Sequence, residues 1–252
     1  MPVSIQVIGS GTWVPRKHRS SACIAATIHD ERILFDCGTG TIRRIAECDI
    51  DYRSIKKIFF THTHIDHTAD LAPLLFAVKH SPDLPEDYSL TLYGPSGYSE
   101  FVTRLRAAYQ PTLDDFNFQF HVQDLTHQVL HMNGWNVTSI PMCHGIPAVG
   151  YRVKYQSRCF AITGDTDYCP SVIELCRDAD IAFVECSTPD NQKIQGHLTP
   201  SLAAQIAAKA QCKKLVLTHF YPPCDEIDVV TQCQKIYNGK VIAAEDLMLF
   251  NV

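Results

Sequence analysis

Apolar and polar residues alternate over residues 3–7, and this period of two predicts a β-strand at the start of the chain. Two more strand-like runs, 22–28 and 32–35, flank a polar His-Asp-Glu turn and predict a hairpin. The apolar run 55–60 predicts a buried strand that ends directly in a series of polar side chains. The first quarter of the chain is therefore expected to contribute mainly to a sheet.

Strand and helix patterns alternate over much of the remaining chain. Helical periodicity begins near Thr41, and residues 116–164 contain several short strand-like runs with few helix signals. The other predicted helices are 69–78, 96–109, 171–177, 200–210 and 227–236, and the other predicted strands include 90–93, 181–184 and 215–218. Because no linker rich in Pro, Gly or Ser interrupts this order, the sequence predicts one compact α/β domain over residues 1–252.

Composition excludes several protein classes. With 46% apolar and 19% charged residues, the chain can form a core and is not a disordered, collagen-like or coiled-coil protein. A net charge of −5 argues against a broad basic face for long nucleic acids. No secretory signal or membrane-length apolar run is present, which favours a cytoplasmic protein with no membrane partner. The eleven cysteines form no Cys-x-x-Cys pair and are expected to be reduced and mostly buried.

The densest group of potential metal ligands follows the strand predicted at 55–60. The segment 61–67 reads Thr-His-Thr-His-Ile-Asp-His, and alternation along an extended chain puts His62 and His64 on one side. After a turn, Asp66 and His67 can reach a neighbouring position. Three imidazoles and a carboxylate supply the nitrogen and oxygen donors that Zn²⁺, Mn²⁺ and Fe ions accept. The segment therefore predicts a metal site.

Three single residues could complete such a site. His144, Asp165 and His219 each stand where a short apolar strand stops. Open α/β sheets present functional groups at the carboxyl ends of their strands, so these side chains are expected to converge with the cluster at 61–67.

This arrangement resembles the metallo-β-lactamase fold superfamily, whose His-x-His-x-Asp-His motif is followed by a His, an Asp and a His. The resemblance spans the chain and implies a four-layer αβ/βα metallo-β-lactamase sandwich with two divalent metal ions, most often Zn, with Mn or Fe as alternatives. It implies that Asp165 bridges the metals; the ligands of the first metal would be His62, His64 and His144, and those of the second Asp66, His67 and His219. True β-lactamases of the superfamily usually have Cys where Asp165 stands, which disfavours a β-lactam substrate.

A narrower resemblance rests on Gly196-His197-Leu198-Thr199-Pro200, preceded by Glu185. These residues are similar to a motif of the ribonuclease Z group, as is the opening segment 9–15. The resemblance implies that His197 lies beside the scissile phosphate as an acid or charge stabiliser and that Glu185 orients it. It also implies that a hydroxide bridging the two metals attacks phosphorus, with Asp66 able to accept a proton. Asp36 and Thr61 are candidate partners for the metal-bound imidazoles, although Asp36 could equally cap the turn at 38.

The chain departs from ribonuclease Z in one segment. Ribonuclease Z proper carries a flexible arm for transfer RNA between its third His and bridging Asp, whereas segment 145–164 here contains only two predicted strands, 148–155 and 158–162. The missing arm and the acidic net charge favour a phosphodiesterase that acts on small phosphodiesters or short RNA.

Other functions remain open on the sequence alone. A transfer-RNA 3′-processing endonuclease and a glyoxalase II-like thioester or lactone hydrolase share the ligand pattern, and a redox di-iron protein or a non-catalytic metal-binding module could use a similar site. Segments 80–86 and 109–120 are expected to influence substrate choice. Four aromatic residues could stack on a base, although such residues more often belong to a core: Phe76, Tyr109, Phe220 and Tyr221. A homodimer is implied only by family habit.

Overall fold

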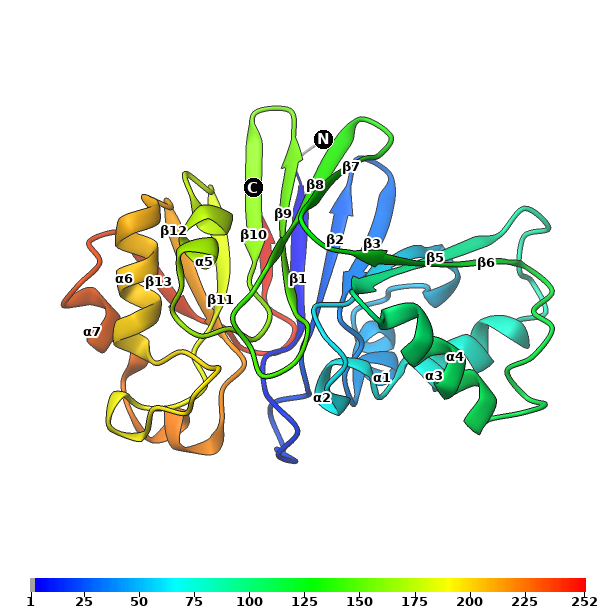
Figure 1. The fold of residues 1–252 in the computed structure, drawn as a ribbon, viewed down its shortest axis with the longest axis horizontal. Coiled ribbons are helices and arrows are strands. Elements are labelled where there is room, and N and C mark those ends of the chain that lie inside the picture. The colour runs from blue at the N-terminus through cyan, green and yellow to red at the C-terminus, as the bar shows by residue number, and fades with distance from the viewer. Residues whose placement is uncertain (1–2) are drawn as a thin grey trace.

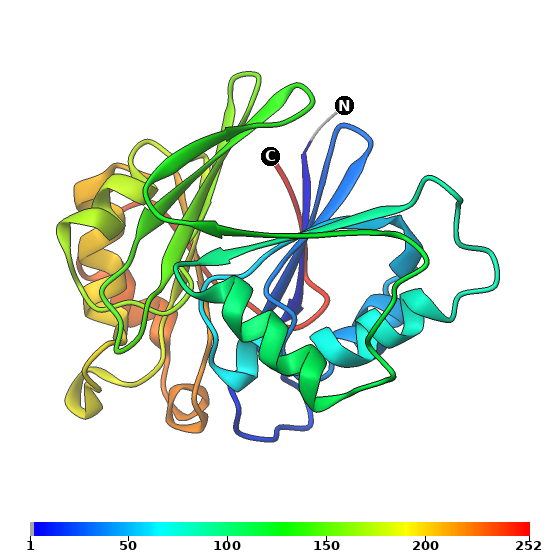
Figure 2. The same ribbon diagram turned by 45° about the vertical axis from the view of Figure 1, so that its right-hand side comes forward.

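The computed structural model describes residues 3–252. Within this range two mixed seven-stranded sheets face each other, and helices cover the outer face of each sheet (Figure 1; Figure 2 shows the same layers from a second side). The predicted four-layer α/β sandwich is thus confirmed.

The first sheet holds most of the amino-terminal half. Its strands, in the spatial order β14-β1-β2-β3-β4-β5-β6, are β14 (Leu249–Asn251), β1 (Ser4–Gly9), β2 (Cys23–Ile28), β3 (Glu31–Phe35), β4 (Ile55–Phe59), β5 (Ser89–Pro95) and β6 (Gln119–Leu125). Its helices are α1 (Thr41–Glu47), α2 (Ile65–Thr68), α3 (Leu71–Lys79) and α4 (Tyr98–Ala108), with a short 3-10 helix at Tyr52–Ser54.

The second sheet holds most of the carboxyl-terminal half. Its strands, in the spatial order β13-β12-β11-β10-β9-β8-β7, are β13 (Lys240–Ala243), β12 (Lys214–Thr218), β11 (Ile181–Glu185), β10 (Arg158–Ile162), β9 (Val149–Tyr155), β8 (Trp135–Pro141) and β7 (Gln128–His131). Its helices are α5 (Pro170–Cys176), α6 (Pro200–Ala210) and α7 (Val229–Gln234), with 3-10 helices at Asp190–Gln192 and Pro222–Glu226.

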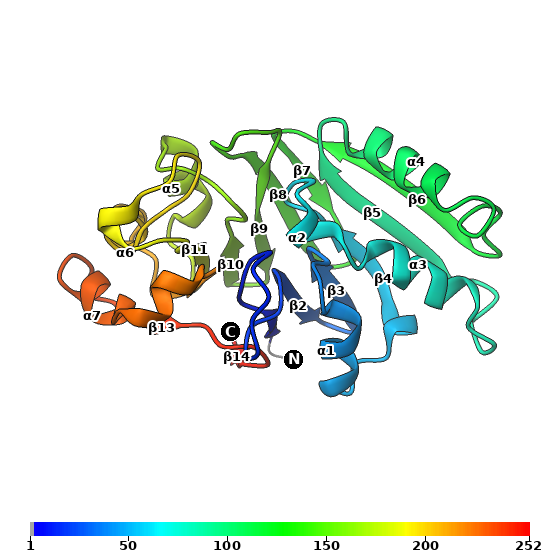
Figure 3. The ribbon, with the colours of Figure 1, turned by 90° about the horizontal axis from the view of Figure 1, so that it is seen from below.

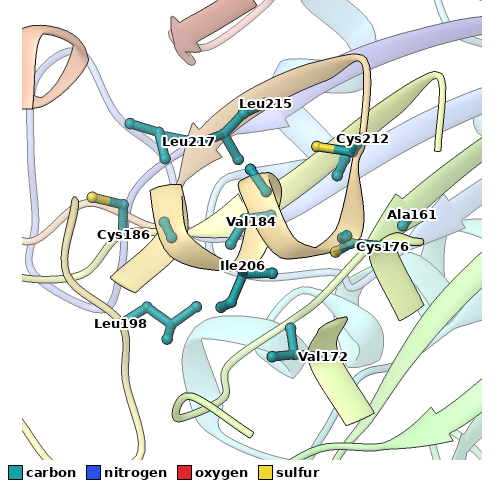
Figure 4. Close-up of a cluster of buried hydrophobic side chains, with 14 of the residues drawn as sticks. Ala161, Val172, Cys176, Val184, Cys186, Leu198, Ile206, Cys212, Leu215 and Leu217 are labelled. Atoms are coloured by element: carbon teal, nitrogen blue, oxygen red, sulfur yellow. The ribbon is translucent and has the colours of Figure 1, made fainter. Parts of the chain in front are cut away.

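Buried clusters of apolar side chains hold these layers together. Between the sheets, Phe59 stacks on Tyr93 with ring centroids 4.6 Å apart and contacts the ring of Tyr151 at 5.3 Å. Outside the second sheet, Ile206 of α6 packs in a cluster that includes Val184 and Leu217 (Figure 4). Each such fully buried apolar side chain stabilises the fold by roughly 1.5–3 kcal/mol relative to exposure.

The structure adds to the predicted secondary structure in two places. The helix expected at 69–78 is present as α3, and a separate helical turn, α2, precedes it; between the two, the carboxylate of Asp70 accepts hydrogen bonds from the backbone of Gly40 and Ile42. The strands β13 and β14 were not predicted at all. They are only four and three residues long, so their sequences carry little periodicity, and their pairing with β12 and β1 supplies the order.

The functional edge of the sandwich is the one seen from below in Figure 3, where loops follow the carboxyl ends of several strands. Backbone hydrogen bonds join the two halves here: Val149 donates to the carbonyl of Thr61 at 2.9 Å, and Phe220 donates to the carbonyl of Ser10 at 3.0 Å. These bonds fix loops from both sheets against each other, so side chains far apart in sequence can meet.

Candidate active site

The segment 61–67 changes conformation in its middle. His62 and His64 lie in the extended stretch after β4, and α2 begins at Ile65, which places Asp66 and His67 in a helical turn. The change from extended to helical backbone separates the two pairs of donors, as the sequence predicted. His62, Asp66 and His67 are all buried.

The structure brings all seven predicted metal-binding residues together at this edge. Their donor atoms form two groups whose members lie within 4.8 Å of one another, His62 with His64, His144 and Asp165, and Asp66 with His67 and His219. A third combination contains Asp165, His197 and His219. The strands that deliver the isolated donors are β8, β10 and β12, each of which ends shortly before its donor.

The donor atoms of the first group lie close to one another. His64 Nδ1 lies 3.0 Å from His62 Nε2 and 3.2 Å from His144 Nε2. Asp165 Oδ2 lies 3.6 Å from His62 Nε2. Three imidazole nitrogens and one carboxylate oxygen thus face a common point.

The donor atoms of the second group lie equally close to one another. His67 Nε2 and His219 Nε2 are 3.2 Å apart, and Asp66 Oδ2 lies 3.3 Å from His219 Nε2. Asp165 Oδ1 lies 3.3 Å from His67 Nε2 and 3.4 Å from His219 Nε2. Asp165 therefore contacts both groups, one oxygen toward each.

Hydrogen bonds on the remote ring nitrogens orient four of the imidazoles. His67 Nδ1 contacts a carboxylate oxygen of Asp36 at 2.7 Å, and His144 Nδ1 contacts the carbonyl of Gly196 at 2.9 Å. The remaining two bind hydroxyl groups that donate their own hydrogens to carboxylates: His62 Nδ1 to Thr61 at 3.0 Å and His219 Nδ1 to Ser187 at 3.0 Å. Since each partner can accept an Nδ1 hydrogen, each Nε2 points into the cluster and, in the neutral imidazole, offers it a lone pair, as metal-binding histidines require.

Asp165 shows that the cluster suits a cation. Its Oδ1 is buried and has no hydrogen-bond partner among residues 3–252, although two imidazole nitrogens lie close by. A buried carboxylate oxygen without a donor is costly unless a positive charge compensates it. The surrounding nitrogen and oxygen donors are those that Zn²⁺ and related ions accept.

The protonation states of the first group also suit metal binding. Burial, with the nearby charge of His67, lowers the pKa of His62 well below its usual value. Burial and His144 similarly lower the pKa of His64. Both imidazoles are therefore neutral at pH 7, which is the form that donates a lone pair to a metal.

In the second group, the pKa of His67 is shifted in the opposite direction. Burial by itself would lower the pKa of His67, but the carboxylates of Asp165 and Asp36 outweigh it and raise that pKa well above its usual value. Burial likewise favours a neutral Asp165, yet the charges of His219, His67 and His62 hold its pKa well below its usual value. Asp165 is thus an anion, and the position beside His67 favours a positive charge, which a bound metal ion would supply in place of a proton.

His197 stands beside the donor cluster and is tied to Glu185. His197 Nδ1 lies 3.2 Å from a carboxylate oxygen of Glu185 and 3.8 Å from Asp165 Oδ2. Glu185 is itself fixed by the backbone amides of Thr166 at 2.6 Å and Leu198 at 3.0 Å. Burial acts against protonation, but the hydrogen bond and charge of Glu185 raise the pKa of His197 to about 9. The predicted pairing of His197 with Glu185 is present in the structure.

Asp36 and Thr61 lie where partners of the imidazoles are needed. Asp36 accepts hydrogen bonds from the Thr61 amide at 2.7 Å and the Thr61 hydroxyl at 2.9 Å, in addition to its contact with His67. Its carboxylate thus faces the cluster rather than the turn at Gly38. Asp36 and His219 also have positive φ angles, 61° and 60°, a conformation that Asp and His adopt more readily than most residues.

Sequence reasoning missed two polar groups of the site. Ser187 donates to Glu185 and contacts both His197 and His219, and Asp167 binds the amide of Gly196 at 2.9 Å. Ser187 follows the end of β11 by two residues, a position that could have drawn attention to it. Nothing in the sequence pairs Asp167 with Gly196, because the two lie in separate loops.

Asp167 is expected to set the orientation of His144 through Gly196, whose carbonyl accepts the His144 Nδ1 hydrogen. Replacing Asp167 with alanine should weaken metal binding about 10- to 100-fold, the usual cost of losing such an indirect support. Chelator competition, followed by metal analysis, measures this. Lys193→Ala is the matched control, because it removes another side-chain partner of Asp167, at 2.9 Å, and leaves the Gly196 bond in place. Equal metal affinity in Asp167→Ala and the native protein would contradict the assignment.

The four candidate base-stacking residues lie in different parts of the structure. Phe220 is buried, so it belongs to the core, whereas Phe76 and Tyr109 are exposed and line a separate hollow on α3 and the segment after α4. Tyr221 is half-buried and lies beside the donor cluster, with its ring 6.0 Å from that of His219. All eleven cysteines are free, most of them buried, and none belongs to a donor group among the described residues.

Comparison with known proteins agrees with this geometry. The family model described as "Beta-lactamase superfamily domain" matches residues 31–220. The chain belongs to this family. Among relatives of this β-lactamase superfamily protein, the ribonuclease Z of Acaryochloris marina is 27% identical over 87% of this chain and 86% of the relative. The ribonuclease Z of Bacillus thuringiensis is 26% identical over 97% of this chain and 98% of the relative.

Solved structures of similar fold include the metallo-β-lactamase fold protein YhfI of Bacillus subtilis, with a TM-score of 0.88, 22% identity and full coverage of both chains. The short form of human tRNase Z has a TM-score of 0.80 and is 26% identical over 98% of each chain. Together with the His and Asp donor groups, these similarities make this β-lactamase superfamily protein a metal-dependent hydrolase of the ribonuclease Z-like type. No helix among its described residues has the length and apolar character needed to span a membrane.

Proposed function

We propose that the protein is a phosphodiesterase that cleaves small phosphodiesters or short RNA. The observation that carries this proposal is the His197–Glu185 pair beside Asp165, because it adds a proton-donating group to a cluster of metal-binding side chains. Phosphodiester hydrolysis needs both a stabilised attacking water and a group that supports the leaving oxygen.

Two zinc ions are the proposed cofactors, with Mn or Fe as alternatives. The two donor groups support this number, since each group has three residues of its own and Asp165 reaches both. The ligands would be His62, His64 and His144 in the first group, Asp66, His67 and His219 in the second, and Asp165 between them. When bound, such ions supply Lewis acidity that lowers the pKa of water and offsets charge on phosphoryl oxygens.

The side chains of the site would have different roles in hydrolysis. Asp66, whose Oδ2 is bonded to His219, has a second oxygen that can accept a proton from the attacking water. Glu185 and Ser187 hold His197 through Nδ1, so its Nε2 is left to donate a hydrogen to the leaving oxygen. Asp36 and Thr61 keep the imidazoles of His62 and His67 oriented.

The loop between β9 and β10 supports a small substrate. The two strands pair from Tyr151 with Ile162 to Tyr155 with Arg158, and only Gln156 and Ser157 connect them. The region that could have carried an arm for a large RNA is therefore a tight hairpin. In agreement, the alignment with the Bacillus thuringiensis ribonuclease Z extends over 307 positions, more than the 252 residues of this chain, so that relative contains additional residues.

A substrate panel tests the proposal. The metal-loaded protein should hydrolyse bis(p-nitrophenyl) phosphate, cyclic nucleotides or short oligonucleotides, with Zn²⁺ and Mn²⁺ supplied in parallel, and chelation should stop the reaction. A transfer-RNA precursor, a thioester and a lactone belong in the same panel. Turnover of the thioester or lactone alone would overturn the proposal in favour of a glyoxalase II-like hydrolase.

A transfer-RNA 3′-processing endonuclease is the second candidate, favoured by the relatives named ribonuclease Z that cover most of the chain. Cleavage of the precursor at its 3′ end, with little activity on small diesters, would support this candidate and show that the arm is dispensable. A homodimer and a cytoplasmic location remain predictions.

A further inference from the structure

An exposed tryptophan stands next to the candidate active site. Trp13 lies in the loop after β1, and 60% of its surface is exposed. Its Nε1 donates a hydrogen bond to the hydroxyl of Tyr221 at 3.1 Å, and the two ring centroids are 6.4 Å apart at an interplanar angle of 78°. Tryptophan is usually largely buried, so a large apolar ring held open to solvent beside a reactive centre calls for a ligand.

Tyr221 connects this tryptophan to the reactive centre. Its ring centroid lies 6.1 Å from that of His197 and 6.0 Å from that of His219, nearly perpendicular to both. Aromatic surface therefore continues from the donor cluster through Tyr221 to Trp13. A phosphodiester held near His197 could therefore place an attached planar group on this surface.

The backbone holds the pair in place. Gly11 forms a parallel bridge with Phe220, and the amide of Tyr221 donates to the carbonyl of Ser187 at 3.1 Å. The bridge joins the loop after β1 to the loop after β12, and the second bond joins the loop after β12 to the loop after β11. Both contacts lie within two residues of a member of the aromatic pair and fix its backbone. A surface fixed in this way loses little entropy when a rigid planar ligand binds.

We propose that Trp13 and Tyr221 form a stacking subsite for a nucleobase attached to the scissile phosphodiester. The proposal rests on the proposed phosphodiesterase function and narrows its substrate class to nucleotide diesters or RNA. Stacking on aromatic side chains tolerates every base and contributes about 5- to 150-fold in affinity per base. The subsite thus provides affinity for nucleotides without a broad basic face.

Fluorescence tests binding without turnover. The chain has two tryptophans, and Trp135 is buried in the core, so quenching by an added ligand reports on Trp13. Adenosine 5′-monophosphate should quench the emission of the metal-loaded protein saturably, whereas ribose 5-phosphate, which lacks the base, should not. The quenching should disappear in Trp13→Phe. Equal effects of both ligands, or an emission that shifts with protein concentration because a second copy covers Trp13, would overturn the proposal.

Kinetics tests the same subsite during the reaction. Thymidine 5′-(p-nitrophenyl) phosphate and methyl p-nitrophenyl phosphate release the same nitrophenolate and differ in the nucleoside. Trp13→Ala should raise the KM for the thymidine ester, relative to that for the methyl ester, about 5- to 150-fold, and Trp13→Phe should restore most of the difference. Leu249→Ala, which removes a side chain of similar exposure (58%) on β14, is the control.

These two experiments separate the possible failures. An unchanged KM ratio in Trp13→Ala would overturn the subsite while leaving the phosphodiesterase function intact. If no phosphodiester is cleaved, the proposed function fails, but base-specific quenching would still demonstrate the subsite.

Discussion

Replacing Asp165 with asparagine is expected to abolish phosphodiester hydrolysis and release bound metal. Asp165 places one oxygen toward each donor group, and three histidines hold its carboxylate in the charged form. Asparagine preserves the shape but removes the negative charge, so both groups lose the anion that they share. Turnover of bis(p-nitrophenyl) phosphate should fall more than about 10³-fold, because both the nucleophile and charge stabilisation depend on the ions. Elemental analysis of the purified variant measures the metal.

Asp87→Asn is the control for Asp165→Asn, since Asp87 is exposed and forms no ion pair or hydrogen bond among those described here. Circular dichroism should establish that both variants are folded. A folded Asp165→Asn protein with the native metal content and native turnover would contradict the two-metal site. Loss of one metal equivalent with partial activity would also contradict it, because the proposed two-metal site requires Asp165 to serve both ions.

The sequence was sufficient to predict which donor side chains meet at this edge, because these residues obey simple rules of position. Four follow one another directly after β4, and the others stand just beyond the ends of β8, β10 and β12. A sheet brings such ends to one edge whatever the details of the loops. The α/β class could be predicted for a similar reason, since strand and helix periodicities are visible in the order of apolar residues. The four-layer order was predicted only because the motifs resemble a known fold family.

The sequence was not sufficient for the contacts that orient those donors. Ser187 and Asp167 act through hydrogen bonds between loops that follow different strands, so their partners depend on how the loops fold together. The short strands β13 and β14 escaped prediction for a related reason, because pairing with β12 and β1 rather than their own sequence determines them. The local sequence pattern determines which donor side chains lie near the edge of the sheets. Tertiary packing of the loops determines the orientation of each side chain.

His197→Ala is expected to lower kcat about 10²- to 10⁴-fold while leaving the metal content unchanged. His197 contacts Asp165 only at 3.8 Å, and its Nδ1 is engaged by Glu185, so its loss removes a proton donor rather than a ligand. KM should change little, because the imidazole acts on the leaving oxygen in the transition state. Steady-state kinetics and elemental analysis on the same preparation separate the two effects.

His121→Ala is the matched control for His197→Ala, because it removes an exposed imidazole from β6. The size of the effect should depend on the leaving group. Nitrophenolate is stable as an anion and needs little help, whereas the alkoxide released from a dinucleotide needs a proton, so the defect of His197→Ala should be larger on the dinucleotide. An equal defect on both substrates would exclude the role of proton donor, and loss of metal would instead make His197 a ligand, as its proximity to Asp165 and His219 allows.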